Sequence, residues 1–171
     1  YHIVNKFKTD VDLELELSIN TTAIKAVLVN GNPVNYQPVA EAIGKPKILI
    51  PAGIHKNYTI QVTTEDSTPE RLQSNAFYAQ GAAFELTSNK AELLELKDPQ
   101  QVLAKVDLAA HQLTGQIASE TGHKMFFVKL KQNEVTWWQP IEIEVKPRFN
   151  LLSTRVTKDS LKITIHNNQS R

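Results

Sequence analysis

The sequence predicts an all-β protein made of two small antiparallel β-sandwich modules. Three observations support this prediction. Apolar and polar residues alternate with a period of two along most of the chain. Turn-forming residues interrupt the alternation at intervals of about 8–12 residues, as they do in sandwich folds. No segment has the length and the 3.6-residue period of a crossover helix, which favours antiparallel pairing.

The first group of expected strands lies before residue 64. Residues 11–19 alternate Val, Leu and Ile with acidic residues and serine, which predicts a strand with one buried and one wet face. Residues 24–29 run into Asn30-Gly31, a dipeptide that readily adopts positive φ and predicts a hairpin turn. The other strands expected in this group are 34–38, 58–63 and 47–50, the last of which should end at Pro51.

A polar segment rich in turn formers, residues 64–81, separates the two groups of strands. Within it Thr68 can cap a short helix whose first position is Pro69. Helix is therefore expected only as a turn or two, near 69–80 or near 39–43.

The expected domain organisation follows from this boundary. A first β-sandwich module covers residues 1–66, a linker covers 67–81, and a second, immunoglobulin-like β-sandwich module covers 82–147. Residues 148–171 have strand patterning around a central turn, and they either complete the first module or start a third. The strands expected in the second module are 83–86, 91–96, 102–108, 112–117, 124–131 and 137–145.

The composition excludes several function classes. The net charge is +1, from 19 basic and 18 acidic residues that are interspersed, so the basic face of a nucleic-acid binder is missing. No apolar stretch approaches the roughly 20 residues that span a bilayer. The chain has no cysteine, which excludes disulfides, thiolate nucleophiles and cysteine-ligated zinc. We expect no cofactor.

Aromatic residues are the strongest candidates for ligand binding. Trp137 and Trp138 are adjacent on an expected strand, so one indole should enter the core while the other faces outward. An outward Trp can stack on a sugar ring, or it can pack against a neighbouring module or loop. Tyr58 raises the same question, and the three residues form the predicted ligand-binding set.

Neither the histidines nor the carboxylates predict a metal or catalytic site. The five histidines have none of the spacings typical of metal ligands. The carboxylates of 12–16 and of 142–144 alternate along single strands, so they share one face and do not oppose each other across a cleft. The sequence also contains no Gly-x-Ser-x-Gly nucleophile elbow and no glycine-rich phosphate loop. We therefore expect no catalytic residue and no bound metal.

A resemblance to a known class of proteins rests on several runs. In the first half they are Ile24-Lys-Ala-Val-Leu-Val-Asn-Gly-Asn-Pro-Val-Asn-Tyr36, Gly44-Lys-Pro-Lys-Ile-Leu-Ile-Pro51 and Lys56-Asn-Tyr-Thr-Ile-Gln-Val62. This half resembles the β-domains attached to large bacterial glycoside-hydrolase-like proteins of the six-hairpin type. The second half resembles small immunoglobulin-like modules of the same proteins, over Phe84-Glu-Leu86, Asp98-Pro-Gln-Gln-Val-Leu103, Gly122-His-Lys-Met-Phe-Phe127 and Trp137-Trp-Gln-Pro140.

The resemblance implies an exported protein, periplasmic or extracellular, from a glycan-degrading context. In such proteins the catalytic carboxylates lie on a helical barrel that this sequence does not contain, so no catalytic residue carries over. The leading hypothesis is a non-catalytic accessory or structural region whose partners are other domains of a longer polypeptide. The alternative is a carbohydrate-binding module that uses an exposed Trp to hold a glycan. An intact small glycoside hydrolase is the third hypothesis.

Overall fold

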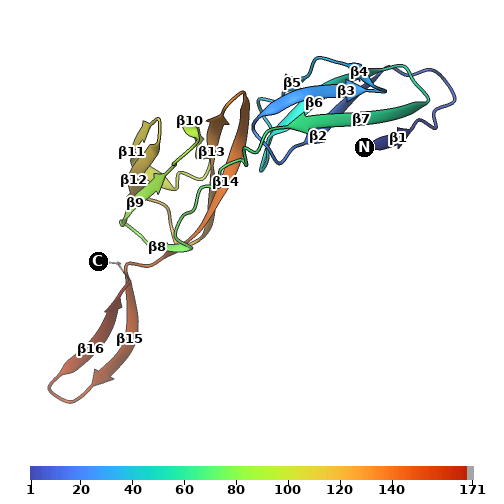
Figure 1. Cartoon of the computed structure of the whole chain (residues 1–171). Helices are drawn as coiled ribbons and strands as arrows, with labels where there is room; N and C mark the ends of the chain where they lie inside the picture. Colours follow the sequence, from blue (N-terminus) through green and yellow to red (C-terminus); the bar gives the residue numbers. More distant parts are fainter. Residues whose placement is uncertain (169–171) are drawn as a thin grey trace. The chain divides into compact units, whose positions relative to one another are not determined.

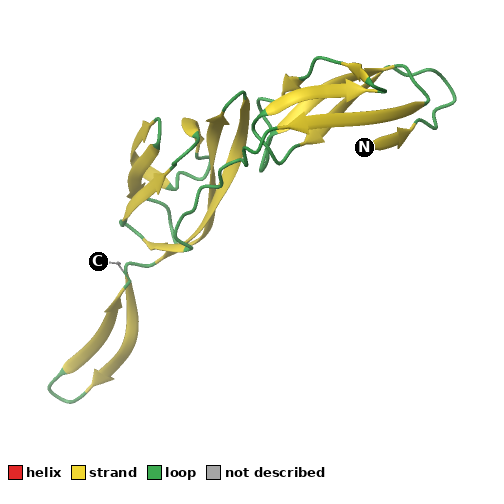
Figure 2. Ribbon diagram, in the orientation of Figure 1, coloured by secondary structure: helices red, strands yellow, loops and turns green. Residues whose placement is uncertain are grey.

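The computed structural model describes residues 1–168 as sixteen β-strands without a helix (Figures 1 and 2). The prediction of an all-β protein is confirmed. Because the described residues contain no helix, they also contain none that could cross a membrane. Of the segment 148–171, whose strands were expected, the last three residues lie outside the described range.

The helical turns expected near 69–80 and 39–43 are wrong. Residues 65–76 follow an irregular path, and 40–41 form a simple turn. The reason is a competing partner for the backbone. The carbonyl of Thr68 accepts a hydrogen bond from Nε2 of Gln132 (3.2 Å), and the amide of Glu70 donates to its Oε1 (2.9 Å). Both backbone groups are thus engaged by a side chain that is distant in sequence.

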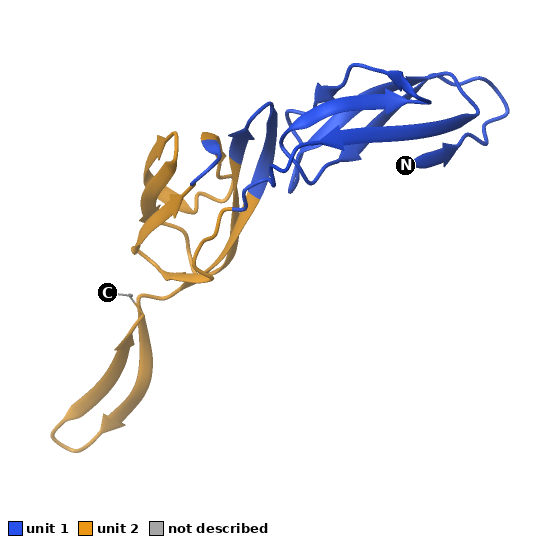
Figure 3. Cartoon of the chain, in the orientation of Figure 1, with its two compact units in different colours: residues 1–71, 89–92, 129–139 blue, residues 72–88, 93–128, 140–171 orange. Residues whose placement is uncertain are grey.

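The chain divides into two compact units, drawn in two colours in Figure 3. Each unit is assembled from three separate stretches of sequence. Unit 1 consists of Tyr1–Arg71, Asn89–Glu92 and Lys129–Gln139, and unit 2 consists of Leu72–Ser88, Leu93–Val128 and Pro140–Arg171 as far as it is described. The segment expected as a linker, 67–81, contains the end of the first stretch of unit 1 and the start of unit 2.

Unit 1 contains two sheets. The first has the order β1 (His2–Val4), β7 (Asn57–Thr64), β3 (Ile24–Val29), β4 (Asn32–Pro33), and the second has the order β2 (Leu13–Ser18), β6 (Lys47–Gly53), β5 (Gln37–Pro38). All pairs in these sheets are antiparallel. Alternate residues of β6 and β7, such as Ile48, Ile50, Tyr58 and Ile60, are almost completely buried, as the period-two pattern predicts.

Two local features of these sheets test the sequence patterns. Asn30 and Gly31 have φ of 51° and 81°, so the predicted tight turn between β3 and β4 is confirmed. The expectation that Pro51 ends a strand is wrong, since β6 continues to Gly53. Pro51 is tolerated because β5 pairs only with residues 48 and 49, so the missing amide faces no strand on that side.

Apart from β15 and β16, the remaining strands of this sandwich-like fold form two further sheets. One has the order β10 (Glu92–Lys97), β13 (Gly122–Gln132), β14 (Val135–Lys146), β8 (Phe77–Ala79), and the other has the order β11 (Leu103–Ala109), β12 (Gln112–Ile117), β9 (Ala83–Thr87). β8 pairs with β14 in parallel, an exception to the antiparallel pairing that the sequence predicts. In unit 2 the ring of Phe84 packs between those of Tyr78 and Phe126, with centroid distances of 5.2 and 5.4 Å.

The last two strands, β15 (Phe149–Val156) and β16 (Leu161–Asn167), form a hairpin that is a sheet of its own (Figure 1). Every residue in both strands is exposed. The turn is closed by hydrogen bonds between Thr157 and Ser160, and the open end by the amide of Asn168, which donates to the carbonyl of Arg148 (2.9 Å). The hairpin is therefore well formed although nothing among the described residues covers it.

Candidate functional site

Both tryptophans of the predicted ligand-binding set are buried. Trp137 is 1% exposed and Trp138 is 3% exposed. Neither indole is open to solvent, so the outward ring that sugar stacking requires is not present. Strand alternation still sends the two side chains to opposite faces of β14, so the second face must also be covered by protein.

The cover over Trp138 is the loop of residues 39–44, which belongs to the same unit. The amide of Trp138 donates to the carbonyl of Ala42 (2.7 Å), and the amide of Gly44 donates to the carbonyl of Trp138 (2.8 Å). Ile43 and Trp138 thereby form an isolated parallel bridge. The loop thus adds a short strand-like pairing to β14 and shields the indole from water.

A charged pair completes the environment of this indole. The Nε1–H of Trp138 donates to Oε2 of Glu41 (2.8 Å), and Nζ of Lys129 donates to Oε1 of the same carboxylate (2.7 Å). The Lys129 ammonium also lies 5.3 Å from the centroid of the Trp138 ring, within the range of a cation–π contact. Of the two outcomes weighed for an outward Trp, packing against a loop is the one the structure contains.

We expect Glu41→Ala to expose Trp138 without unfolding unit 1. The substitution removes the acceptor for the indole N–H and the partner of Lys129, so the loop loses the side chain that bonds to the ring. The expected cost is about 1–2 kcal/mol of unfolding free energy, typical of a hydrogen bond to a charged group. The measurement is acrylamide quenching of tryptophan fluorescence, which should increase.

Glu134→Ala is the matched control for Glu41→Ala. It removes another exposed carboxylate of unit 1, which accepts a hydrogen bond from the phenol of Tyr36 (3.3 Å). Quenching in this variant should equal that of the wild-type protein. Equal quenching of the Glu41 variant and the wild-type protein would show that Glu41 does not hold the loop over the ring.

Tyr58, the third member of the predicted set, is also buried, at 1% exposure. Its hydroxyl donates to the carbonyl of Gly53 (3.0 Å) and accepts from the amide of His55 (2.9 Å). The His55 ring packs edge-on against the Tyr58 ring at 5.5 Å. Tyr58 thus braces the turn between β6 and β7, and the structure does not bring it together with the tryptophans into one surface.

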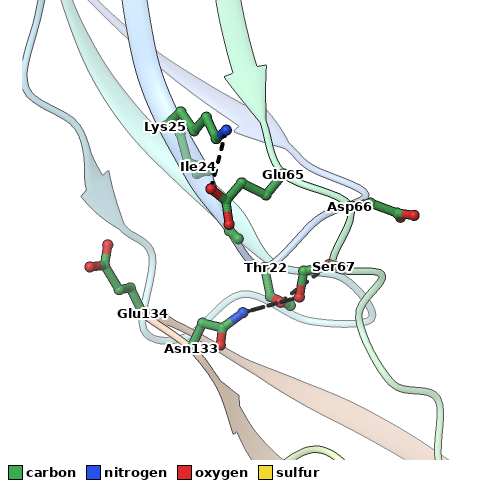
Figure 4. A pocket seen from close by; sticks show the side chains of 9 residues that line it. Thr22, Ile24, Lys25, Glu65, Asp66, Ser67, Asn133 and Glu134 are labelled. Carbon is green, nitrogen blue, oxygen red and sulfur yellow. Dashed lines mark hydrogen bonds and ion pairs between the residues drawn. The ribbon is translucent and has the colours of Figure 1, made fainter.

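A polar pocket of about 520 Å³ lies in unit 1 (Figure 4). At one end Nδ2 of Asn133 donates to the hydroxyls of Thr22 (2.9 Å) and Ser67 (3.0 Å), which lie 2.6 Å from each other. At the other end Lys25 pairs with Glu65 (3.2 Å). The pocket offers hydrogen-bonding groups, but the side chains at its two ends already bond to one another.

Glu134, which with Asp66 is one of the two other acids that line this pocket, lies beside a tyrosine. The Tyr36 hydroxyl donates to Oε2 of Glu134 (3.3 Å). Partial burial, followed by the negative charge of Glu134, raises the pKa of Tyr36 above its ordinary value. The phenol therefore stays protonated at neutral pH, as a hydrogen-bond donor and not as a base.

Two further carboxylates accept hydrogen bonds from the backbone amides of loops. The sequence patterns do not predict either of them as a site. Glu70 accepts three backbone hydrogen bonds, from the amides of Asn89 (2.8 Å), Lys90 (2.8 Å) and Ala91 (2.7 Å). Asp98 accepts those of Val102 and Leu103. Within residues 1–168 no group of three or more His, Asp or Glu residues could hold a metal ion.

Comparison of the chain with protein-family models, with curated proteins and with solved structures found no match.

Proposed function

We propose that this chain is a non-catalytic accessory or structural region of an exported, carbohydrate-active bacterial protein. In this role its β-sandwich modules, immunoglobulin-like in the second half, pack against or position other domains of a longer polypeptide. The compartment would be the periplasm or the cell exterior. The carbohydrate context and the location are supported by the sequence resemblance in residues 24–62 and 84–140.

One observation carries the structural role. The side chains best suited to catalysis or ligand recognition are engaged in hydrogen bonds that stabilise the fold. The Trp138 indole bonds to Glu41, the Glu70 carboxylate takes three backbone amides, and the Tyr58 hydroxyl bonds twice to the backbone. A region whose reactive groups are engaged in this way is suited to holding a defined shape.

The alternative of a carbohydrate-binding module depended on an exposed Trp. Both tryptophans of the chain are buried, so neither offers a ring face for sugar stacking in this structure. No other observation favours glycan binding over the structural role, and we do not propose it as a second function.

We expect the wild-type chain to release no sugar and to bind none. The first assay measures reducing ends after incubation with soluble polysaccharides that cover the common plant and bacterial linkages. The second is affinity electrophoresis in gels that contain the same polysaccharides, with bovine serum albumin as the unretarded control. Sugar release would establish a hydrolase, and specific retardation would establish a binding module. Either outcome contradicts the proposed role.

A further inference from the structure

The hairpin β15–β16 has one apolar face and one polar face. Residues directly opposite each other in an antiparallel pair point to the same side. The pairs Leu151–Ile165 and Val156–Leu161 therefore share a face with Phe149 and Ile163, and with the polar partners of these two residues, Asn167 and Thr154. The other face carries Asn150, Ser153, Arg155, Lys162, Thr164 and His166. The pleat has thus separated all the charges of the two strands from the large apolar side chains of the first face.

We call the six residues Phe149, Leu151, Val156, Leu161, Ile163 and Ile165 the apolar hairpin face. Their exposed fractions range from 49% for Phe149 to 76% for Val156. At such exposure each side chain offers on the order of 100 Å², so the face presents roughly 600 Å² of apolar surface. An isolated two-stranded hairpin is marginal in water, and a contiguous apolar patch of this size marks an interaction site.

We propose that the apolar hairpin face binds the same face of a second copy of this chain. Two copies stacked face to face would form a small four-stranded sandwich with polar outer surfaces. Such an interface would bury roughly 1,200 Å² in total, which exceeds the roughly 1,000 Å² that a specific interface needs. The strand residues on this face carry no charge; the guanidinium of Arg148, which precedes β15, lies 5.4 Å from the centroid of the Phe149 ring at the end of the face.

The uncovered apolar surface also decides between two ways of joining the hairpins. Pairing of β16 edge to edge with its copy would leave the apolar face exposed to water. Face-to-face stacking instead puts Arg155 and Lys162 on the two outer surfaces. Packed sheets lie about 10 Å apart, which is close to the Debye length at ordinary salt, so this repulsion is screened.

The inference goes beyond the proposed accessory role and does not rest on it. The first test uses the 171-residue chain and measures its mass by size-exclusion chromatography with light scattering over a wide concentration range. We expect the mass of two chains at high concentration and of one chain on dilution. Ile163→Asp puts a charge in the centre of the face, and we expect it to raise the dimer dissociation constant by about 100-fold or more.

Thr164→Asp is the matched control. It adds the same charge one residue further along the same strand, on the polar face, and the dissociation constant should stay as in wild type. A chain that is monomeric at every concentration, or that forms aggregates without a defined dimer, overturns the proposal. So does a dimer that Ile163→Asp leaves intact.

A second experiment locates the contact even if a charged variant fails to form the hairpin. The chain contains no cysteine, so Ile163→Cys and Thr164→Cys each introduce a single thiol. A bismaleimide of about 10 Å, matching the spacing of packed sheets, should join two copies of the Ile163→Cys chain. It should join far fewer copies of the Thr164→Cys chain. Equal yields of cross-linked product from the two variants would overturn the face-to-face arrangement.

Discussion

Replacing either Trp137 or Trp138 by alanine should lower the free energy of unfolding of unit 1 by about 3–5 kcal/mol, the usual cost of truncating a buried Trp. The two losses should be of similar size because the side chains are 1% and 3% exposed. Trp137 is among the largest fully buried side chains of the chain's described residues. Trp138 fills the space under residues 39–44, where it also has a hydrogen bond to Glu41.

Chemical denaturation followed by tryptophan fluorescence measures this effect. Both tryptophans of the chain belong to unit 1, so each single variant keeps one reporter in the unit being tested. Phe7→Ala is the control, because Phe7 is an aromatic residue of the same unit that is 64% exposed. Its effect should stay within about 0.5 kcal/mol. A loss at Trp138 as small as that at Phe7 would contradict the covered position of its indole.

Replacing Glu70 by alanine should cost about 2–3 kcal/mol, the second largest effect we expect. The carboxylate accepts three backbone hydrogen bonds, and hydrogen bonds to charged groups are stronger than neutral ones. Water can replace the carboxylate at the exposed residues Asn89 and Lys90, but Ala91 is 0% exposed. Its amide would lose this acceptor at a position that water does not reach.

Amide hydrogen exchange localises the effect of Glu70→Ala, since the amides of residues 89–91 should exchange faster while those of β6 stay protected. Glu70→Gln keeps a side-chain oxygen as acceptor and should lose less stability than Glu70→Ala. Glu65→Ala is the charge control, because it removes a surface ion pair with Lys25 (3.2 Å) whose members are both more than half exposed. Such pairs contribute about 0–1 kcal/mol. A Glu70 variant no less stable than the Glu65 variant would refute the bracing role.

The buried faces of several strands could be predicted because they depend on local chemistry. Within β6 and β7, Ile48, Ile50, Tyr58 and Ile60 are buried where the period-two pattern predicts. Asn30-Gly31 forms the predicted turn because the positive φ of both residues is a property of the dipeptide itself. Such features need no knowledge of any distant segment.

Two of the failed predictions involve partners that are far apart in sequence. Alternation places Trp138 on the face of β14 opposite to Trp137, but it contains no information on whether another segment covers that face. Glu41, which bonds to the Trp138 indole, lies 97 residues away. The helical turn expected after Thr68 is displaced by Gln132, which is 64 residues from Thr68. The same limit applies to the candidate site, because exposure of an aromatic ring depends on its neighbours in space.

The sequence by itself determined the all-β class, the alternating faces of the strands and the tight turn after β3, since each depends on residues within a few positions of one another. Only the tertiary structure decided that both tryptophans are buried, that β8 pairs with β14 in parallel, and that Glu70 organises residues 89–91. These features depend on which distant segments meet when the chain folds. A side chain that could bind a ligand in an isolated strand then becomes an internal contact.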